Sequence, residues 1–430
     1  MDLSSLPQFA NVGQIQSKSW KNGSLDLRPI RLAVAVSHPI QHFAPWHREI
    51  AKIEDVDLRV FFFCDWGVAS YLDPEFGVPI CWDIPLLEGY PYEFLPTARR
   101  PRHLSFWQLD NPSVEKALER FSPDVVQVFG YAHRTNWRVS SWTSRQRKPL
   151  LLFSDSNVRA PKPRWKRLLK AVVVRKFYSR VDGALFVGDN NRAYHRHYGL
   201  PDERLFPGAY PIGRSEILAA VPDRERARRR LREELRIPAD AFVVIFCGKY
   251  SPRKCPLDLV AAAHTAFQNG LPVWALLVGE GSERSTIEEY CRRSGVRNAV
   301  LTGFINQSSL PEYYVAADAL AVTSSYDPHP LVVTEGACLG LPAIVSDRVG
   351  CIGANDTARP GVSALVYPWG NRERLKDAIV SLYQDRALYE RMFAAVLQIS
   401  ETQDAPVVAQ QLVNAVGALH SMGPRSRGAA

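Results

Sequence analysis

The sequence lacks long apolar runs, patterned cysteines and internal repeats, and these absences narrow the class of protein. No window approaches the roughly 20 consecutive apolar residues of a membrane-spanning helix. The seven cysteines are odd in number, scattered and without the spacing of a metal site, which favours a reducing cytoplasm. Residues 1–28 are polar and lack the apolar core of a signal peptide, so we expect a loosely ordered tail.

Length and composition predict an ordinary globular protein with more than one domain. The chain has 430 residues, enough for two domains of about 200 residues each. Hydrophobic residues make up 46% of it and charged residues 23%, as in a typical soluble fold. The net charge is +9, and the excess of cations is unevenly spread along the chain.

The stretch from Asp327 to Asp347 is the most informative part of the sequence. Two acids, Asp327 and Glu335, lie eight positions apart around a Pro/His loop and a short apolar run. The pattern predicts a loop that leads into a helix, a helix end at Gly340 and a buried strand over 342–346. A helix N-terminus suits a phosphate. A carboxylate one or two turns inside the helix can accept both hydroxyls of a ribose.

This pattern resembles the acidic-x7-acidic signature of the retaining glycosyltransferases of family 4, which have the GT-B fold. The family usually has Glu at the first position and an aromatic–Gly pair where His329 and Pro330 stand here. The resemblance implies an α/β protein of two doubly wound parallel-sheet, Rossmann-like domains that face each other across a cleft. It also implies a nucleotide diphosphate sugar as donor substrate, with no cofactor or metal required. The alternative for Asp327 alone is a simple helix cap.

A basic loop precedes this stretch. A buried strand over 243–247 runs into Gly248, and Lys249 and Lys254 follow. Cations at the carboxyl end of a parallel strand are where open α/β sheets bind ligands, and two of them can clamp a diphosphate from both sides. The family has a Gly-Arg pair and a Lys-Gly pair here, so Lys249 replaces Arg and Cys255 replaces Gly. A solvated basic loop is the alternative.

Two further segments keep the order of the family motifs. A strand over 274–278 ends in a turn with Gly279 and Gly281, where the missing side chains permit close approach of a ligand. In the family, the segment after Gly303 lies against the nucleotide base, and here that segment begins with Phe304 and Ile305. The alternation of strands and helices from about 241 to 395 predicts a doubly wound parallel sheet.

The N-terminal half offers candidate contacts to the sugar or the acceptor. A buried strand over 30–36 ends in a polar loop that contains His38, Gln41 and His42. Family members often carry a His that reaches the donor sugar or the acceptor, and His133 is the residue that we assign to this role. Nothing in the spacing separates His133 from His38 or His42. For His38, Gln41 and His42, a helix-capping or packed side chain is the alternative in each case.

The resemblance also predicts the domain boundaries. Residues 1–28 form the tail, 29–209 the acceptor-side domain and 210–395 the donor domain. Residues 396–430 form a helix that returns to the N-terminal domain, as in relatives, followed by a flexible end.

A basic segment, residues 162–180, contains many cations and no acid. Its apolar residues lie close to helical spacing: Trp165, Leu168, Leu169, Val172 and Phe177. A basic amphipathic helix can rest on an anionic membrane, and many family members act on lipid-linked acceptors. The alternative is a helix that buries its apolar stripe in the domain core. No nucleic-acid motif accompanies the cations, so nucleic acid is not an expected partner.

These features predict a hexosyltransferase-type enzyme that moves a sugar to an acceptor hydroxyl with retention of configuration, in glycan, polysaccharide or glycolipid biosynthesis. Lys249 and Lys254 would neutralise the departing diphosphate, helped by N–H groups near Leu331 and Val332. Glu335 would bind the ribose and Asp327 the transferred sugar.

The acceptor class stays open among glycans, lipid-linked molecules and small molecules. We expect a cytoplasmic protein, with peripheral contact to the inner membrane face through residues 162–180 as a further expectation. Two alternatives to the transferase remain. One is a GT-B enzyme of other chemistry, a nucleotide-sugar epimerase or a phosphorylase. The other is a non-catalytic module that binds a nucleotide sugar.

Overall fold

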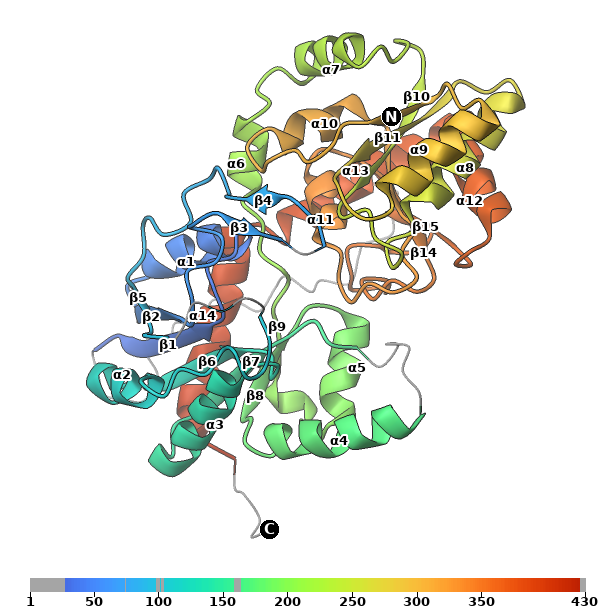
Figure 1. The fold of residues 1–430 in the computed structure, drawn as a ribbon. Helices are drawn as coiled ribbons and strands as arrows, with labels where there is room; N and C mark the ends of the chain where they lie inside the picture. Colours follow the sequence, from blue (N-terminus) through green and yellow to red (C-terminus); the bar gives the residue numbers. More distant parts are fainter. Residues whose placement is uncertain (1–27, 74, 98–100, 102–103, 158–163, 426–430) are drawn as a thin grey trace, which may run out of the picture.

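The computed structural model describes residues 28–73, 75–97, 101, 104–157 and 164–425. Two parallel sheets, each covered by helices, form two α/β domains (Figure 1). The expected tail lies outside the described residues except for Arg28, whose guanidinium pairs with Asp124 at 2.8 Å. None of the described helices has both the length and the apolar content to cross a membrane.

The N-terminal domain is built on a seven-stranded sheet in which all neighbours are parallel, in the order β5-β2-β1-β6-β7-β8-β9. Its strands are β1 (Ile30–Val36), β2 (Val56–Phe62), β5 (Tyr92–Phe94), β6 (Val125–Phe129), β7 (Leu150–Phe153), β8 (Gly183–Phe186) and β9 (Leu205–Pro207). Its helices are α1 (Phe43–Ala51), α2 (Val114–Phe121), α3 (Arg134–Gln146), α4 (Arg164–Tyr178), α5 (Asp189–His197) and the 3-10 helix η2 (Asp202–Arg204). A short hairpin of β3 (Tyr71–Leu72) and β4 (Pro79–Ile80) lies outside this sheet.

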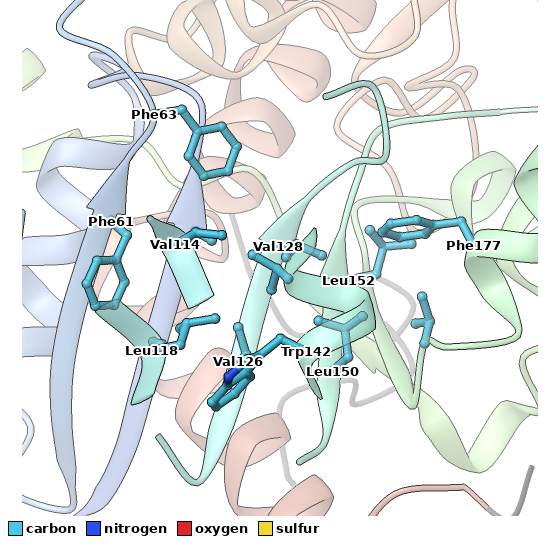
Figure 2. Close-up of a cluster of buried hydrophobic side chains, with 14 of the residues drawn as sticks. Phe61, Phe63, Val114, Leu118, Val126, Val128, Trp142, Leu150, Leu152 and Phe177 are labelled. Carbon is cyan, nitrogen blue, oxygen red and sulfur yellow. The ribbon is translucent and has the colours of Figure 1, made fainter. Parts of the chain in front are cut away.

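Strand β1 shows why this sheet forms at the centre of the domain. Its residues from Leu32 to Val36 are all buried, as expected for a parallel strand covered on both faces. Ala33 and Ala35 join an apolar cluster that includes side chains of α2, α3 and α4 (Figure 2). Leu32 and Val34 join a second cluster with α1 and the C-terminal helix. Because alternate residues of β1 point to opposite faces of the sheet, the strand contributes side chains to the apolar core on both faces.

The C-terminal domain has a six-stranded parallel sheet in the order β12-β11-β10-β13-β14-β15. Its strands are β10 (Phe242–Cys247), β11 (Val273–Val278), β12 (Ala299–Leu301), β13 (Ala319–Val322), β14 (Ala343–Ser346) and β15 (Ala364–Tyr367). Its helices are α6 (Arg214–Ala219), α7 (Arg224–Glu234), α8 (Pro256–Gln268), α9 (Arg284–Ser294), α10 (Leu310–Ala316), α11 (Leu331–Cys338), α12 (Arg372–Gln384) and α13 (Arg386–Glu401). Two apolar clusters cover the two faces of this sheet, as in the N-terminal domain.

The chain crosses between the domains twice, and the two crossings lie side by side. The Ile212 amide donates to the Gln403 carbonyl at 3.1 Å, and the Ala405 amide donates to the Ile212 carbonyl at 2.9 Å. Helix α14 (Ala405–Met422) then packs with α1 in the N-terminal core. Helix α13 runs to Glu401, so the boundary expected at 395 falls inside a helix rather than between two elements.

Several element ends differ from the sequence-based expectation. Helix α11 ends at Cys338, two residues before Gly340, because Leu339 already leaves helical geometry. The sequence also predicts a short strand over 300–304, but β12 stops at Leu301 and the chain turns at Gly303 with φ +81°. The hairpin β3–β4 was not predicted, since its strands of two residues each are too short to show a period of two.

His47 is a buried histidine in α1 that has no polar partner among the described residues. Its ring is 1% exposed, and neither nitrogen makes a hydrogen bond. Burial, with a smaller contribution from the neighbouring Arg48 cation, lowers the pKa of His47 from 6.5 to about 3. The ring of Tyr90 lies 5.1 Å away, centroid to centroid, and offers no compensating negative charge. The folded protein therefore holds this ring neutral.

We predict that His47 makes the protein sensitive to acid. Below pH 6.5 the unfolded chain protonates this side chain and the folded one does not, so the free energy of unfolding falls as the pH drops toward 3. The slope from this group is up to about 1.4 kcal/mol per pH unit. Urea unfolding between pH 7 and 4.5 gives the free energy of unfolding at each pH. This free energy should fall less steeply with decreasing pH for His47→Phe than for the wild type. Exposed His197→Phe is the control, and parallel curves for wild type and His47→Phe would contradict the assignment.

Candidate functional site

The carboxyl ends of the two parallel sheets meet at the boundary between the domains. His42, after β1, has its Nδ1 atom 3.6 Å from a Glu335 oxygen on α11. The ring of Tyr210, in the first crossing, lies 5.0 Å from the ring of His329, centroid to centroid. Open α/β sheets bind ligands outside the carboxyl ends of their strands. We therefore take this interdomain boundary as the candidate site.

Glu335 lies on the first turns of α11 and is 4% exposed. Its two oxygens accept hydrogen bonds from the Tyr314 hydroxyl at 2.6 Å and from the Gln307 side-chain amide at 3.2 Å. Burial and the adjacent Cys247 and Glu335 raise the pKa of Tyr314 well above its ordinary value, so Tyr314 keeps its proton and remains a donor. A buried carboxylate needs such donors. Both oxygens are thus held in fixed directions.

Lys254 and Asp327 form an ion pair between two loops of the C-terminal domain. Their side chains are 19% and 6% exposed, so the pair is largely removed from water. The loops are also joined through their backbones. The Thr323 hydroxyl donates to the Lys254 carbonyl at 2.8 Å, and the Ser325 amide donates to the Arg253 carbonyl at 2.8 Å. The basic loop therefore has a fixed position relative to Asp327.

Lys249 does not point toward this pair's carboxylate. Its ammonium group contacts both carboxylate oxygens of Asp73 at 3.1 Å and one oxygen of Glu75 at 2.9 Å. Both acids belong to the N-terminal domain, next to the β3–β4 hairpin. The two lysines of the basic loop therefore contact acids on different domains: Lys249 contacts Asp73 and Glu75 of the N-terminal domain, and Lys254 contacts Asp327 of its own domain. They do not converge on one shared group, as the expected diphosphate clamp would require.

The glycines of the site have distinct surroundings. A Cβ atom added to Gly279 would lie 1.9 Å from the Gly248 carbonyl oxygen, and one on Gly281 would lie 2.5 Å from the Tyr250 carbonyl oxygen. Gly279 and Gly281 are therefore needed for close packing against the basic loop. A Cβ on Gly248, at φ +144°, would meet nothing within 4 Å. Of the three, Gly248 is the one that leaves open space at the site.

The candidate histidines fall into two groups. His38 and His133 interact with each other, and burial lowers the pKa of each to about 4. His42 lies at Glu335, where burial lowers its pKa and the carboxylate partly offsets the effect. Gln41, beside His42, is half-buried. Burial lowers the pKa of His329 to about 4.

The remaining candidates lie along the loops of the C-terminal domain. Phe304 faces the N-terminal domain, with its ring centroid 5.4 Å from that of Phe76. Ile305 and Val332 pack against the core of their own domain, which leaves mainly their backbone groups for a ligand. Pro330 precedes the first turn of α11, which begins at Leu331. Its ring lacks an amide hydrogen, so the free N–H groups of this turn start at Leu331.

Sequence reasoning missed residues that the fold brings to the site. Asp155 lies two residues after the end of β7, close to the Tyr210 hydroxyl. Burial and the nearby Asp327 carboxylate raise the pKa of Asp155. The position of Asp155 shortly after a buried strand could have marked it as a candidate from the sequence. Nothing in the sequence marks Asp73 and Glu75, because their partner Lys249 lies more than 170 positions along the chain.

Within the described part of the chain, no group of three or more His, Cys, Asp or Glu side chains is arranged to hold a metal ion. The candidate site is instead made of paired opposite charges and hydrogen-bonded acids. Such groups can bind an anion and hydroxyl groups.

Comparison with known proteins relates the C-terminal domain to glycosyltransferases. Residues 227–396 match the family model of glycosyl transferases group 1. The chain is 33% identical over 180 residues to the lipopolysaccharide core biosynthesis glycosyltransferase LpsD of Rhizobium meliloti, a match that covers 42% of this chain and 50% of LpsD. It is 26% identical over 194 residues to alpha-D-kanosaminyltransferase of Streptomyces kanamyceticus, covering 45% and 48%. The chain thus spans about half the length of the curated relatives that it matches.

Solved structures match over nearly the whole chain. Anabaena Alr3699/HepE in complex with UDP has a TM-score of 0.68 at 18% identity, covering 90% of this chain and 99% of that one. WaaG, a glycosyltransferase involved in lipopolysaccharide biosynthesis, has a TM-score of 0.60 at 16% identity, covering 89% and 98%. At these identities the likeness concerns the fold. It confirms the expected GT-B architecture of two facing parallel-sheet domains.

We predict that Gly279→Ala displaces the basic loop. The added methyl group collides with the Gly248 carbonyl, while the backbone is also forced to a positive φ that alanine disfavours. Gly270→Ala is the matched control, because Gly270 has φ +82° but open space around its Cβ position. Chemical unfolding should show Gly270→Ala losing roughly 1–3 kcal/mol and Gly279→Ala losing more. Equal losses would mean that the close approach is unimportant.

Proposed function

We propose that the protein is a retaining glycosyltransferase of family 4 that transfers a hexosyl group from a nucleotide diphosphate sugar to an acceptor hydroxyl. The observation that carries the proposal is the buried pair Asp327–Lys254 at the loop that leads into the helix of the buried Glu335, in the order and spacing of the family signature. The match of residues 227–396 to glycosyl transferases group 1 supports the same activity. HepE, which shares the fold, binds UDP and UDP-glucose.

The donor would lie against the C-terminal domain. Glu335 would accept the hydroxyls of the ribose, exchanging its bond from Gln307 for bonds from the sugar. Phe304 and Ile305 would border the base. The free N–H groups of Leu331 and Val332 would bind the diphosphate at the positive end of α11.

The lysines would act on the leaving group. As the bond between the sugar and the diphosphate breaks, negative charge grows on the phosphate oxygen, and fixed cations close to it lower the barrier. Lys254 is suited to this task because its loop is fixed by Thr323 and Ser325. Asp327 would orient Lys254 and hold hydroxyls of the transferred sugar. The acceptor would enter from the N-terminal domain, where His38, His42 and His133 line the boundary.

We predict that Lys254→Ala and Glu335→Ala each remove most of the transfer activity. Loss of one fixed charge at a developing anion costs about 100- to 1,000-fold in rate. Transfer is measured as nucleoside diphosphate release with UDP-, GDP- or ADP-sugars and a pool of acceptors. Lys52→Ala, an exposed lysine paired with Glu49, is the control. Full activity of Glu335→Ala would count against the assignment, and donor turnover without an acceptor would favour an epimerase or a phosphorylase.

The effect of Lys254→Ala on stability needs its own control, because it leaves Asp327 buried without a cation. The double variant Lys254→Ala/Asp327→Asn removes both charges. It should regain part of the lost melting temperature but none of the lost activity. This separates a role in transfer from a role in folding.

We also propose that α4 brings the protein to an anionic membrane surface, as suits a lipid-linked acceptor. The expected apolar stripe is divided in the structure: Phe177 is buried, whereas Trp165 is 63% and Val172 66% exposed. The side chains of Leu168 and Leu169 lie outside the described residues. Arg175 and Lys176 are exposed on the same helix. Exposed apolar groups between cations suit a surface of anionic headgroups over acyl chains.

We predict that the charge reversal Arg175→Glu/Lys176→Glu weakens sedimentation with vesicles that contain phosphatidylglycerol. Each basic residue near an anionic surface contributes about 1 kcal/mol, so the double reversal should lower the binding constant at least about 30-fold at low salt. Arg229→Glu on α7, in the C-terminal domain, is the control. Equal binding of all three proteins would show that α4 is not the contact.

A further inference from the structure

An arm of the N-terminal domain crosses to the C-terminal domain at the candidate donor site. We define the arm as residues 71–73 and 75–83, which include β3 and β4. Figure 1 shows this hairpin on the side of its domain that faces the other one. The arm is joined to the C-terminal domain by its acids at Lys249 and by a second set of contacts at residues 304–308.

The second set of contacts anchors the arm beside the segment assigned to the nucleotide base. The Asn306 side-chain amide donates to the Cys81 carbonyl at 2.8 Å. The Asp83 carboxylate accepts from the amide of Ser308 at 3.1 Å and from its hydroxyl. The ring of Phe304 lies near two rings of the arm, 5.4 Å from Phe76 and 6.4 Å from Trp82, centroid to centroid.

The first set of contacts uses the whole hydrogen-bonding capacity of Lys249. An ammonium group has three protons, and Lys249 has three carboxylate oxygens within 3.1 Å, two from Asp73 and one from Glu75. The nitrogen also lies 4.9 Å from the centroid of the Phe76 ring. A phosphate that binds Lys249 must therefore displace at least one carboxylate oxygen.

The two acids differ in how firmly they are held. Asp73 is 8% exposed, and one of its oxygens also accepts from the amides of Glu75 and Phe76, at 2.9 and 3.0 Å. These bonds form a local turn that fixes the Asp73 carboxylate. The Glu75 side chain is 51% exposed and makes one ion-pair contact. Of the two, Glu75 is the group that an incoming anion can exchange.

We propose that Glu75 is a built-in competitor for the donor diphosphate at Lys249. In the absence of donor its carboxylate occupies the position of a phosphate oxygen, and Asp73 keeps the lysine at the domain boundary. Donor binding replaces the Glu75 contact, so this side chain lowers donor affinity while the other contacts of the arm remain. This inference rests on the proposed function, since it requires that Lys249 binds the diphosphate.

Glu75→Gln tests the competition directly, because glutamine keeps the size of the side chain and removes its charge. Calorimetric titration with UDP, GDP and ADP should show a dissociation constant about two- to fivefold lower for Glu75→Gln than for the wild type, the range of a partly exposed ion pair. Glu88→Gln is the matched control, an exposed acid of the same domain, and it should bind as the wild type does.

A double-mutant cycle assigns the effect to Lys249. In a Lys249→Met background the substitution Glu75→Gln should no longer change the dissociation constant, because the shared partner is gone. An unchanged or raised dissociation constant of Glu75→Gln, with clear binding by the wild type, overturns the competition but leaves the proposed function standing. Absence of binding of all three nucleotides by both proteins overturns the donor class and the competition together.

Discussion

Burial of carboxylates between two domains is the constraint on which the candidate site depends. A carboxylate removed from water requires cations or hydrogen-bond donors, and leaving it without them is strongly destabilising. Asp327 meets this requirement through Lys254, and Glu335 through Tyr314 and Gln307. These partners come from the basic loop, from α10 and from the segment that precedes α10. The acids are therefore in place only when several separate elements have assembled around them.

The contacts between the two domains also bear on how the domains can separate. The two crossings are hydrogen-bonded to each other at Ile212, so they form one short connection about which a domain can turn. Several contacts far from it are polar: Asn190 donates to the carbonyls of Gly350 and Ile352 at 3.0 and 2.9 Å, and Lys249 contacts the arm. Water or a ligand can replace such bonds at little cost. Water cannot replace the apolar contact between α14 and α1 in this way, so helix α14 stays packed on the N-terminal domain.

The parts of the structure that follow from local sequence were predictable, and those that depend on the second domain were not. Strand β1 from Leu32 onward and strand β10 are continuous apolar runs that end in polar loops, a pattern typical of a parallel strand buried on both faces. The pairing of Lys254 with Asp327 joins two motifs of one domain, each visible in the sequence. The ion pair of Lys249 with Asp73 joins an unpredicted hairpin to a distant loop. No sequence pattern predicts that contact, because it depends on how the two folded domains lie against each other.

Three histidines of the candidate site do not carry positive charge. With pKa values of about 4, His38, His133 and His329 are neutral near pH 7, so under the proposed function none of them can supply a cation to a departing diphosphate. A neutral imidazole can still exchange hydrogen bonds with a sugar hydroxyl. Among the three, His133 has a buried Nδ1 atom without a hydrogen-bond partner in the described part of the chain. A buried polar atom without a hydrogen-bond partner destabilises the folded protein unless a ligand supplies that partner. Under the proposed function, that cost favours His133 as the contact to the sugar, and Lys254 and Lys249 would stabilise the charge.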